Sequence, residues 1–276
     1  MRIRRRLSFA RPLRRVLALA GLLSVLAACA SGTPGTGRRV TAGGGGGGGA
    51  SASAPADGGN NPFLARVPKF GPAPAPVRIT LPTGGPYAPI YHRLPVTQPV
   101  AFLTMDDGLV RLPQAIQLMR AAHIPFTMFL IAPVAASDPP FFQQLEATGG
   151  VVEDHTITHP ILRGKSYAFQ HNEICGAIPT LVHTFGRHPE FFRPPYGDYD
   201  QTTLKAVHDC GLKAAFYWSE TVNDGKVFYQ TSLHRISAGD IILMHFRPRF
   251  VDDVLAALKA IHDAGLTPAL LEDYLV

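Results

Sequence analysis

Val100-Ala101-Phe102-Leu103-Thr104-Met105-Asp106-Asp107-Gly108 places two adjacent carboxylates directly after an apolar run. An apolar run of this length, bounded by a turn signal, is typical of a buried strand. Two carboxylates at the end of such a strand repel each other, so one takes up a proton unless a cation or a metal ion compensates. Neutral metal ligands elsewhere in the chain would support a metal. They occur at His155 and His159, again directly after an apolar stretch.

Short apolar runs alternate with amphipathic stretches over the last 200 residues, which is the pattern of strands joined by crossover helices. We expect an α/β fold, a distorted (β/α) barrel with about seven parallel strands. The expected strands are 100–104, 126–131, 151–152, 191–192, 214–218, 241–244 and 268–271. Helical spacing is clear over 112–122 and 251–264, and weaker over 169–185 and 201–210.

The unusual polar residues follow these runs instead of preceding them. The carboxyl ends of parallel strands converge on one face, where active sites are built. We therefore expect five segments to meet in one site. Their polar residues are Asp106 and Asp107, His155 and His159, Arg193, Asp224, and His245.

Each of these elements also has an ordinary structural explanation when taken alone. Asp-Asp-Gly is commonly a turn, and His-x-x-x-His is commonly one polar face of a helix. Asp224 stands in Asn223-Asp224-Gly225, a strong turn signal. The order and placement of the segments together favour a site.

The N-terminal segment indicates export. Seven arginines precede the apolar run 16–28, as in a secretory signal, and Leu26-Ala27-Ala28-Cys29 matches a lipoprotein cleavage box, with the lipid on Cys29. We expect residues 1–28 to be the signal peptide and the protein to be extracytoplasmic and lipid-anchored to the membrane. An uncleaved anchor or a simple signal peptide, giving a secreted protein, is the alternative. Both general secretory and twin-arginine export stay open.

Residues 29–76, rich in Gly, Ala and Pro, are expected to be a disordered tether, and residues 77–276 one catalytic domain. Without residues 1–28 the chain has 19 Lys and Arg against 20 Asp and Glu, a formal charge of −1. The basic balance of the whole chain therefore belongs to the targeting segment, and nucleic acid is not an expected partner. Cys175 and Cys210 either form a disulfide or remain free thiols.

The motifs resemble those of the polysaccharide deacetylases with a NodB-homology domain, carbohydrate esterase family four, over residues 97–272. Thr104 to Gly108 resembles the first motif of that family, and His155 to His159 the second. Arg193-Pro194-Pro195-Tyr196-Gly197 is similar to the third, and Leu243-Met244-His245 to the fifth. The fourth motif departs from the family pattern, because Asp224 is followed by Gly225 where the family has a tryptophan.

The resemblance implies that Asp107, His155 and His159 bind a divalent ion, zinc first, with cobalt or nickel as alternatives. Asp106 is the implied general base, and His245 the implied general acid. The backbone N–H of Tyr196 would stabilise the oxyanion. Arg193, with Asp224 as its expected partner, would keep Asp106 ionised.

The implied activity is removal of acetyl groups from N-acetylated glycans, such as cell-wall peptidoglycan or chitin-like oligomers, by a monomer. Two alternatives stay open. The same site would suit an O-acetyl esterase acting on xylan or another glycan. A non-catalytic glycan-binding lipoprotein would keep the fold without the activity, although every expected ligand, base and acid is present.

Overall fold

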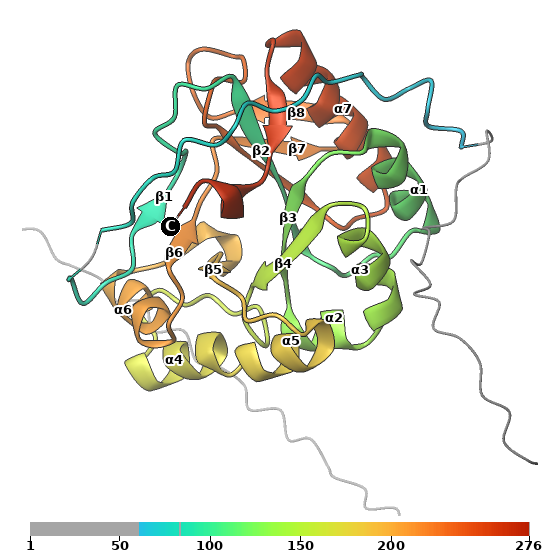
Figure 1. Cartoon of the computed structure of the whole chain (residues 1–276). Helices are drawn as coiled ribbons and strands as arrows, with labels where there is room; N and C mark the ends of the chain where they lie inside the picture. The colour runs from blue at the N-terminus through green and yellow to red at the C-terminus, as the bar shows by residue number, and fades with distance from the viewer. Residues whose placement is uncertain (1–60, 83, 276) are drawn as a thin grey trace, which may run out of the picture. The chain divides into compact units, whose positions relative to one another are not determined.

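The computed structural model describes residues 61–82 and 84–275, whose strands form one curled, mostly parallel sheet, an open half-barrel (Figure 1). The strand order is β1-β6-β5-β4-β3-β2-β9-β7-β8, and β10 pairs separately with β2. Only the hairpin β7–β8 is antiparallel among these pairs. The strands are β1 (Ile90–Tyr91), β2 (Val100–Asp107), β3 (Phe126–Leu130), β4 (Gly150–Asp154), β5 (Phe191–Phe192), β6 (Ala214–Phe216), β7 (Glu220–Asn223), β8 (Lys226–Tyr229), β9 (Ile241–His245) and β10 (Thr267–Ala269).

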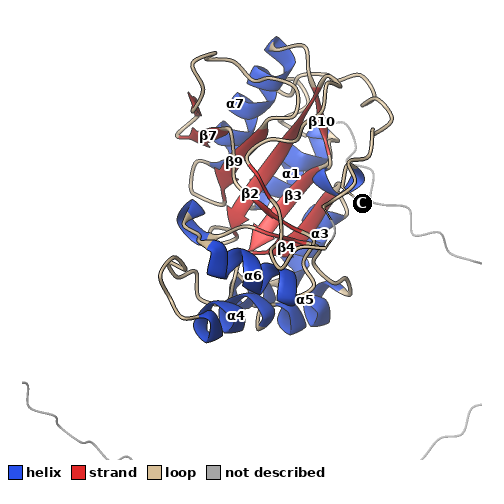
Figure 2. Ribbon diagram, turned by 90° about the vertical axis from the view of Figure 1, so that its left-hand side faces the viewer, coloured by secondary structure: helices blue, strands red, loops and turns tan. Residues whose placement is uncertain are grey.

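Helices cover the outer face of this sheet. In both views α4, α5 and α6 lie together at the lower end, and α7 lies at the upper end (Figures 1 and 2). The helices are α1 (Pro113–Ala122), α2 (Ala132–Ala136), α3 (Pro139–Glu146), α4 (Tyr167–Cys175), α5 (Ile178–Phe185), α6 (Gln201–Asp209) and α7 (Phe250–Asp263). None of the helices in the described residues is long and apolar enough to cross a membrane.

The core divides at β2, because successive residues of a strand face opposite sides. Phe102 packs inside the half-barrel in one cluster with Phe129 and Phe216. Leu103, one residue on, packs outside it in a second cluster that contains Leu118 of α1 and Leu258 of α7. All eight residues of β2 are buried, so its final two carboxylates lie at the edge of a closed core.

The last residues of the domain close one end of the half-barrel interior. Leu271, Tyr274 and Leu275 belong to the inner cluster, and the Tyr274 ring meets Phe102 edge to face at 5.1 Å between centroids. The Tyr274 carbonyl accepts a hydrogen bond from the N–H of Ile79 at 2.7 Å. The segment around Ile79 and the C-terminal residues therefore meet near the amino end of β2, opposite the carboxylates.

All seven expected strands are present, as β2 to β6, β9 and β10. The structure adds β1, the hairpin β7–β8 and the helices α2 and α3. Both added helices carry proline at their start, a position where proline costs no hydrogen bond but where the sequence resembles a loop. The expected helix over 169–185 is two helices, because α4 ends at Cys175, with Gly176 as its C-cap, and α5 begins at Ile178.

The expectation of a disordered tether as far as residue 76 is wrong for its final part. Phe63 is only 6% exposed and packs in the outer cluster, against which Val67 and Phe70 also lie. Asn61 donates from its side chain to the Gln117 carbonyl of α1 at 2.7 Å. The few apolar residues of this segment suffice to bind it to the domain. The expected signal peptide, Cys29 and the rest of the tether lie outside the described residues.

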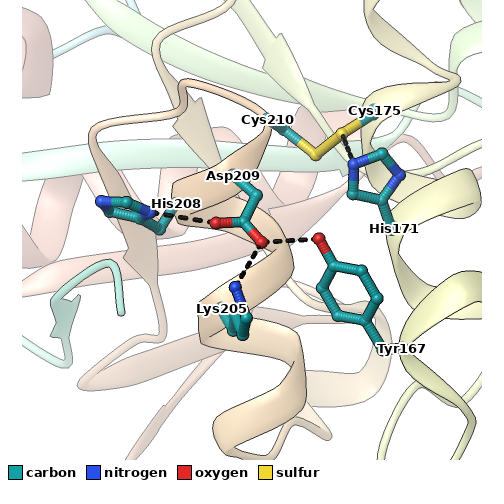
Figure 3. The surroundings of a disulfide bond; sticks show 7 residues. All are labelled: Tyr167, His171, Cys175, Lys205, His208, Asp209 and Cys210. Carbon is teal, nitrogen blue, oxygen red and sulfur yellow. Dashed lines mark hydrogen bonds and ion pairs between the residues drawn. A yellow bond between two sulfur atoms is a disulfide. The ribbon is translucent and has the colours of Figure 1, made fainter. Parts of the chain in front are cut away.

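Cys175 and Cys210 form a disulfide between the C-terminal ends of α4 and α6, with their Cα atoms 5.1 Å apart (Figure 3). The alternative of two free thiols is therefore not what the structure contains. His171, one turn before Cys175 on α4, places its Nε2 atom 3.2 Å from the Cys175 sulfur. The bond fixes the end of α4 to the end of α6.

Candidate metal centre

The carboxylates of Asp106 and Asp107 are held at the end of β2, with only 3% and 7% of each residue exposed. The strand turns sharply there, because Asp107 has φ 76° and Gly108 has φ 85°. A positive φ is uncommon outside glycine, and aspartate is one of the residues that tolerates it. The turn therefore ends the strand at Asp107, its second carboxylate.

Two imidazoles from the loop after β4 face Asp107. The Nε2 atoms of His155 and His159 lie 3.5 Å and 3.3 Å from Asp107 Oδ1. The Nδ1 atom of His155 lies 2.7 Å from the Arg193 carbonyl. Since a carbonyl only accepts, Nδ1 carries the proton, and the Nε2 lone pair is left free toward Asp107.

These three residues fit a divalent metal ion. Asp107 Oδ1 is buried and has no hydrogen-bond partner, although an unpaired buried carboxylate oxygen is costly. Ligand bonds of about 2.0–2.2 Å separate neighbouring atoms of a tetrahedral site by roughly 3.3–3.5 Å, and the observed separations match. Zinc and other transition metals accept such a mixed nitrogen and oxygen set.

Their protonation states also suit a ligand set. Burial lowers the pKa of His159, so its imidazole is neutral and has a lone pair to offer. Burial acts to raise the pKa of Asp107, but the neighbouring imidazoles, with His155 first, outweigh it, and the pKa lies below its ordinary value. A charged carboxylate and a neutral imidazole are the forms that bind metal.

Arg193 lies behind Asp106 and is fully buried. Its Nη1 atom donates to Asp106 Oδ1 at 2.8 Å and to Thr104 Oγ1 at 2.7 Å, while Nη2 donates to the Tyr217 carbonyl at 3.1 Å. The guanidinium stacks on Phe129, 4.3 Å from the ring centroid. Burial lowers the pKa of Arg193, and the charge of Asp106 opposes this effect and favours the charged guanidinium.

His245 ends β9, in register with Asp106 of β2. Burial lowers the pKa of His245, against the opposing charge of Asp106. The sheet therefore brings a third imidazole to the same edge as the two carboxylates, from a strand that neighbours β2. An imidazole with a lowered pKa gives up its proton readily once it is protonated.

Tyr196 stands at the outer side of the histidine pair. Its ring lies 4.6 Å from that of His159 and it is 65% exposed, in a backbone turn with φ 60°. Gly197, next in the chain, has no room for a side chain. A Cβ atom there would lie 2.2 Å from the Tyr217 ring, which stacks on Trp218 at 4.0 Å. Three aromatic side chains thus border the site, where they offer flat apolar surface.

The expected pairing of Arg193 with Asp224 is wrong. Arg193 uses Asp106, and Asp224 lies in the β7–β8 turn, where its carboxylate accepts from the Asn223 side chain at 3.3 Å. The next residue, Gly225, donates its N–H to Asp253 of α7 at 2.7 Å. The hairpin turn is therefore held against α7, and Asp224 is not brought to the buried guanidinium.

Glu153 and Asp154 do not orient His155 by hydrogen bonding. Glu153 accepts from Arg187 and from the N–H groups of Glu190 and Phe191. Asp154 accepts from the N–H of Thr156 at 2.7 Å.

Thr104 belongs to the first motif but was not among the predicted site residues. Its hydroxyl donates to the Ile242 carbonyl and accepts from Arg193. Its position two residues before Asp106, on the same side of a strand, was the available signal.

The comparisons with known proteins agree with this geometry. Residues 93–215 match the family model described as polysaccharide deacetylase. An uncharacterised protein of Streptomyces coelicolor is 36% identical over 192 residues, covering 68% of this chain and 77% of that protein. A chitooligosaccharide deacetylase of Bradyrhizobium is 30% identical over 152 residues, covering 52% of this chain and 69% of that protein.

Two further relatives show the range of the group. A peptidoglycan-N-acetylglucosamine deacetylase of Bacillus cereus is 27% identical over 152 residues, covering 53% of this chain and 55% of that protein. A structure of a Bacillus anthracis pseudoenzyme of family 4 has the same fold, with a TM-score of 0.59 and 16% identity over 67% of this chain and 68% of that chain. With its motifs, its half-barrel and its buried Asp-His-His set, this chain belongs to the polysaccharide deacetylase family, carbohydrate esterase family 4.

Proposed function

We propose that this chain is a metal-dependent N-deacetylase of acetylated glycans. The observation that carries the proposal is the meeting of Asp107, His155 and His159 around one unpaired buried oxygen, beside an Asp106 already paired with Arg193. A binding protein gains nothing from two adjacent buried carboxylates, one of which lacks a partner. An enzyme needs both, one for the ion and one for the proton.

The two carboxylates divide the work. Asp107 would hold the ion with His155 and His159, and the ion would supply a Lewis acid and lower the pKa of a bound water. Asp106 would take the proton of the attacking water on Oδ2, since Oδ1 is engaged by Arg193 and no hydrogen bond within the described residues holds Oδ2. Arg193 fixes the orientation of Asp106 through the contact of 2.8 Å between its Nη1 atom and Asp106 Oδ1.

The leaving group needs a proton from another residue. An amine leaves poorly as an anion, and His245 stands ready to protonate the nitrogen from the neighbouring strand. The N–H of Tyr196 would donate to the oxyanion that forms on the acetyl oxygen when water adds to the carbonyl carbon. Zinc is the proposed ion, with cobalt and nickel as alternatives that the same ligand set accepts.

Peptidoglycan is the proposed polymer, because the expected lipid on Cys29 would hold the domain near the cell wall. The related chitooligosaccharide and peptidoglycan deacetylases act on N-acetylated sugars, which supports an amide substrate over an O-acetyl ester. The anchor has its own test. Cys29→Ser should release the protein from the membrane fraction of expressing cells and abolish its labelling by radioactive palmitate.

Acetate release tests the activity. The metal-stripped protein would be offered peptidoglycan, chitooligosaccharides and acetylated xylan, with and without added zinc or cobalt. We expect metal-restored release from an N-acetylated substrate, and its loss in Asp106→Asn, which keeps the three ligands. Release from xylan alone would make the chain an O-acetyl esterase. Metal uptake without release from any substrate would make it a glycan-binding pseudoenzyme.

A further inference from the structure

We infer that Glu173 of α4 is a positioning residue that holds the loop carrying the two metal-ligand histidines. The inference rests on the proposed metal-dependent function. Glu173 lies 18 residues beyond His155 in the sequence and outside every motif considered above. Only 5% of the residue is nevertheless exposed, and its side chain contacts the loop 155–159.

The loop has an unfavourable backbone that something must hold in place. Thr156 has φ 71° and His159 has φ 56°, so two of its five residues adopt the left-handed conformation without being glycine. Each such residue costs on the order of 1–3 kcal/mol and persists only where the surrounding structure fixes it. One of the two is itself a proposed ligand.

Every backbone N–H of this loop has an identified acceptor. His155 donates to the Leu130 carbonyl, Thr156 to the Asp154 side chain, and His159 to Thr156 Oγ1. The two remaining donors, the N–H groups of Ile157 and Thr158, both go to Glu173. The loop therefore depends on α4 for its two central hydrogen bonds.

Glu173 uses three separate acceptor atoms for this task. Its backbone carbonyl accepts from Ile157 N–H at 3.2 Å. Its side-chain Oε2 accepts from Thr158 N–H at 2.8 Å, and Oε1 accepts from Thr158 Oγ1 at 2.9 Å. Two bonds to one residue fix both its backbone and its side chain. Because Thr158 directly precedes His159, they also fix the start of the strained ligand residue.

The helix that presents Glu173 is itself braced. A Cβ atom on Gly176 would lie 2.7 Å from the Ile157 side chain, so the end of α4 packs against the loop without a gap. Cys175, two residues after Glu173, is bonded to Cys210 of α6 (Figure 3). The hydrogen bonds of Glu173 thus connect the ligand loop to a helix pair that is covalently joined.

Gln170 supplies a matched control on the same helix. It is fully buried, as Glu173 nearly is, but its side chain bonds the Lys165 carbonyl at 2.9 Å and Thr203 of α6 at 2.5 Å. Replacing Gln170 disturbs α4 and its contact with α6 without removing an acceptor from the ligand loop. A change in zinc Kd that both substitutions share would come from the disturbed helix, and the remaining change in the Glu173 variant would come from the lost contacts to the loop.

The test is zinc binding to metal-stripped full-length protein by titration calorimetry, with the unfolding temperature of each metal-free variant measured beside it. Supporting partners of metal ligands typically contribute 10–100-fold to affinity. We expect Glu173→Ala to weaken the zinc Kd by that range. Glu173→Gln, which keeps one oxygen acceptor and the side-chain shape, should weaken it less, and Gln170→Ala should leave it within about twofold.

Equal Kd shifts in Glu173→Ala and Gln170→Ala, or no shift in Glu173→Ala, would overturn the inference. If the alanine variant does not fold, Glu173→Gln keeps the test decisive. A wild-type zinc Kd in the glutamine variant, with a folded Gln170→Ala control beside it, would also count against the inference. If the wild-type chain bound none of zinc, cobalt and nickel, the result would be a different one, because it would refute the proposed function itself.

Discussion

His245 differs from the other two histidines of the candidate site in its position in the fold and in its proposed role. It comes from β9, whereas His155 and His159 come from the loop after β4. Its proposed role as a general acid would depend on the leaving group, because a group that leaves as a stable anion needs no proton. The metal ligands, in contrast, are needed for any acyl substrate. This difference separates the two roles experimentally.

We expect His245→Asn to lower kcat on an N-acetylated sugar by about 10²–10⁴-fold, the usual contribution of general acid catalysis. On an aryl acetate, whose phenolate leaves unaided, the loss should be much smaller. His155→Asn serves as the comparison, since losing a metal ligand should impair both substrates alike. Equal losses on both substrates in His245→Asn would assign the residue another role.

Glu220 shows the same physics of buried carboxylates away from the site. It is fully buried at the start of β7, and neither of its oxygens has a hydrogen-bond partner. Burial first, and then the charge of Asp240, raise its pKa from an ordinary 4.5 to about 8. The folded protein therefore keeps a proton on Glu220 at neutral pH, whereas the unfolded chain releases it above pH 4.5.

This difference predicts that the free energy of unfolding falls as pH rises from about 4.5 to 8, because the folded state binds more protons there. Glu220→Gln cannot ionise and can donate to Asp240, so it should remove this loss and be more stable than wild type at pH 9. Urea unfolding of both proteins at pH 5, 7 and 9 measures the effect. Gln230→Ala, an exposed substitution that removes no ionisable group, is the control and should leave the pH profile unchanged.

At the scale of elements, the disulfide connects two helices that sequence patterns defined only weakly. It closes a 35-residue separation between α4 and α6. A loop of that length implies a stabilisation of about 4 kcal/mol if the bond acts by restricting the unfolded chain. The double substitution Cys175→Ser and Cys210→Ser should lower the free energy of unfolding by up to that amount in denaturant titrations. An unchanged unfolding midpoint would show that non-covalent contacts alone, such as the shared cluster of Ile174, Ala206 and Val207, hold α4 against α6.

The strands were predictable because each is a short apolar run bounded by polar residues, and burial requires that pattern. The hairpin β7–β8 was not predictable, because each of its strands has only four residues and neither forms a continuous buried run. Buried and half-buried residues alternate along β7, and exposed and half-buried residues alternate along β8. The turn Asn223-Asp224-Gly225 was visible in the sequence. Its direction was not, because the Asp253 hydrogen bond that holds it comes from a distant helix.

The meeting of the candidate residues at one edge of the sheet was predictable, because each follows a strand and the carboxyl ends of parallel strands converge there. These residues are Asp106, Asp107, His155, His159, Arg193 and His245, and their chemical roles stay predictions. Asp224 does not pair with Arg193, because it follows β7, whose end is held against α7 by the hydrogen bond from Gly225 to Asp253. Glu173 could not be found at all. Its importance arises from a contact between a helix and a loop, and no local pattern in α4 records it.

At the scale of the whole molecule, the domain begins earlier than its composition suggests. Phe63 is 6% exposed within the outer core cluster, whereas Leu64 is 52% exposed. Burying a side chain of that size contributes about 1.5–3 kcal/mol. Phe63→Ala should therefore lower the free energy of unfolding by that amount, and Leu64→Ala should lower it by no more than about 0.5 kcal/mol. Equal effects would mean that the segment does not pack on the domain in solution.

The closing of the half-barrel by Leu271, Tyr274 and Leu275 has a consequence for how the protein is made. These residues follow every strand of the sheet in the sequence, so they are synthesised after all of them, and the inner cluster around Phe102 lacks part of its packing until they arrive. A domain folds as a unit, so a nascent chain that does not yet contain Tyr274 cannot complete this one. The order of synthesis therefore delays completion of the inner core until every strand of the sheet has already been made.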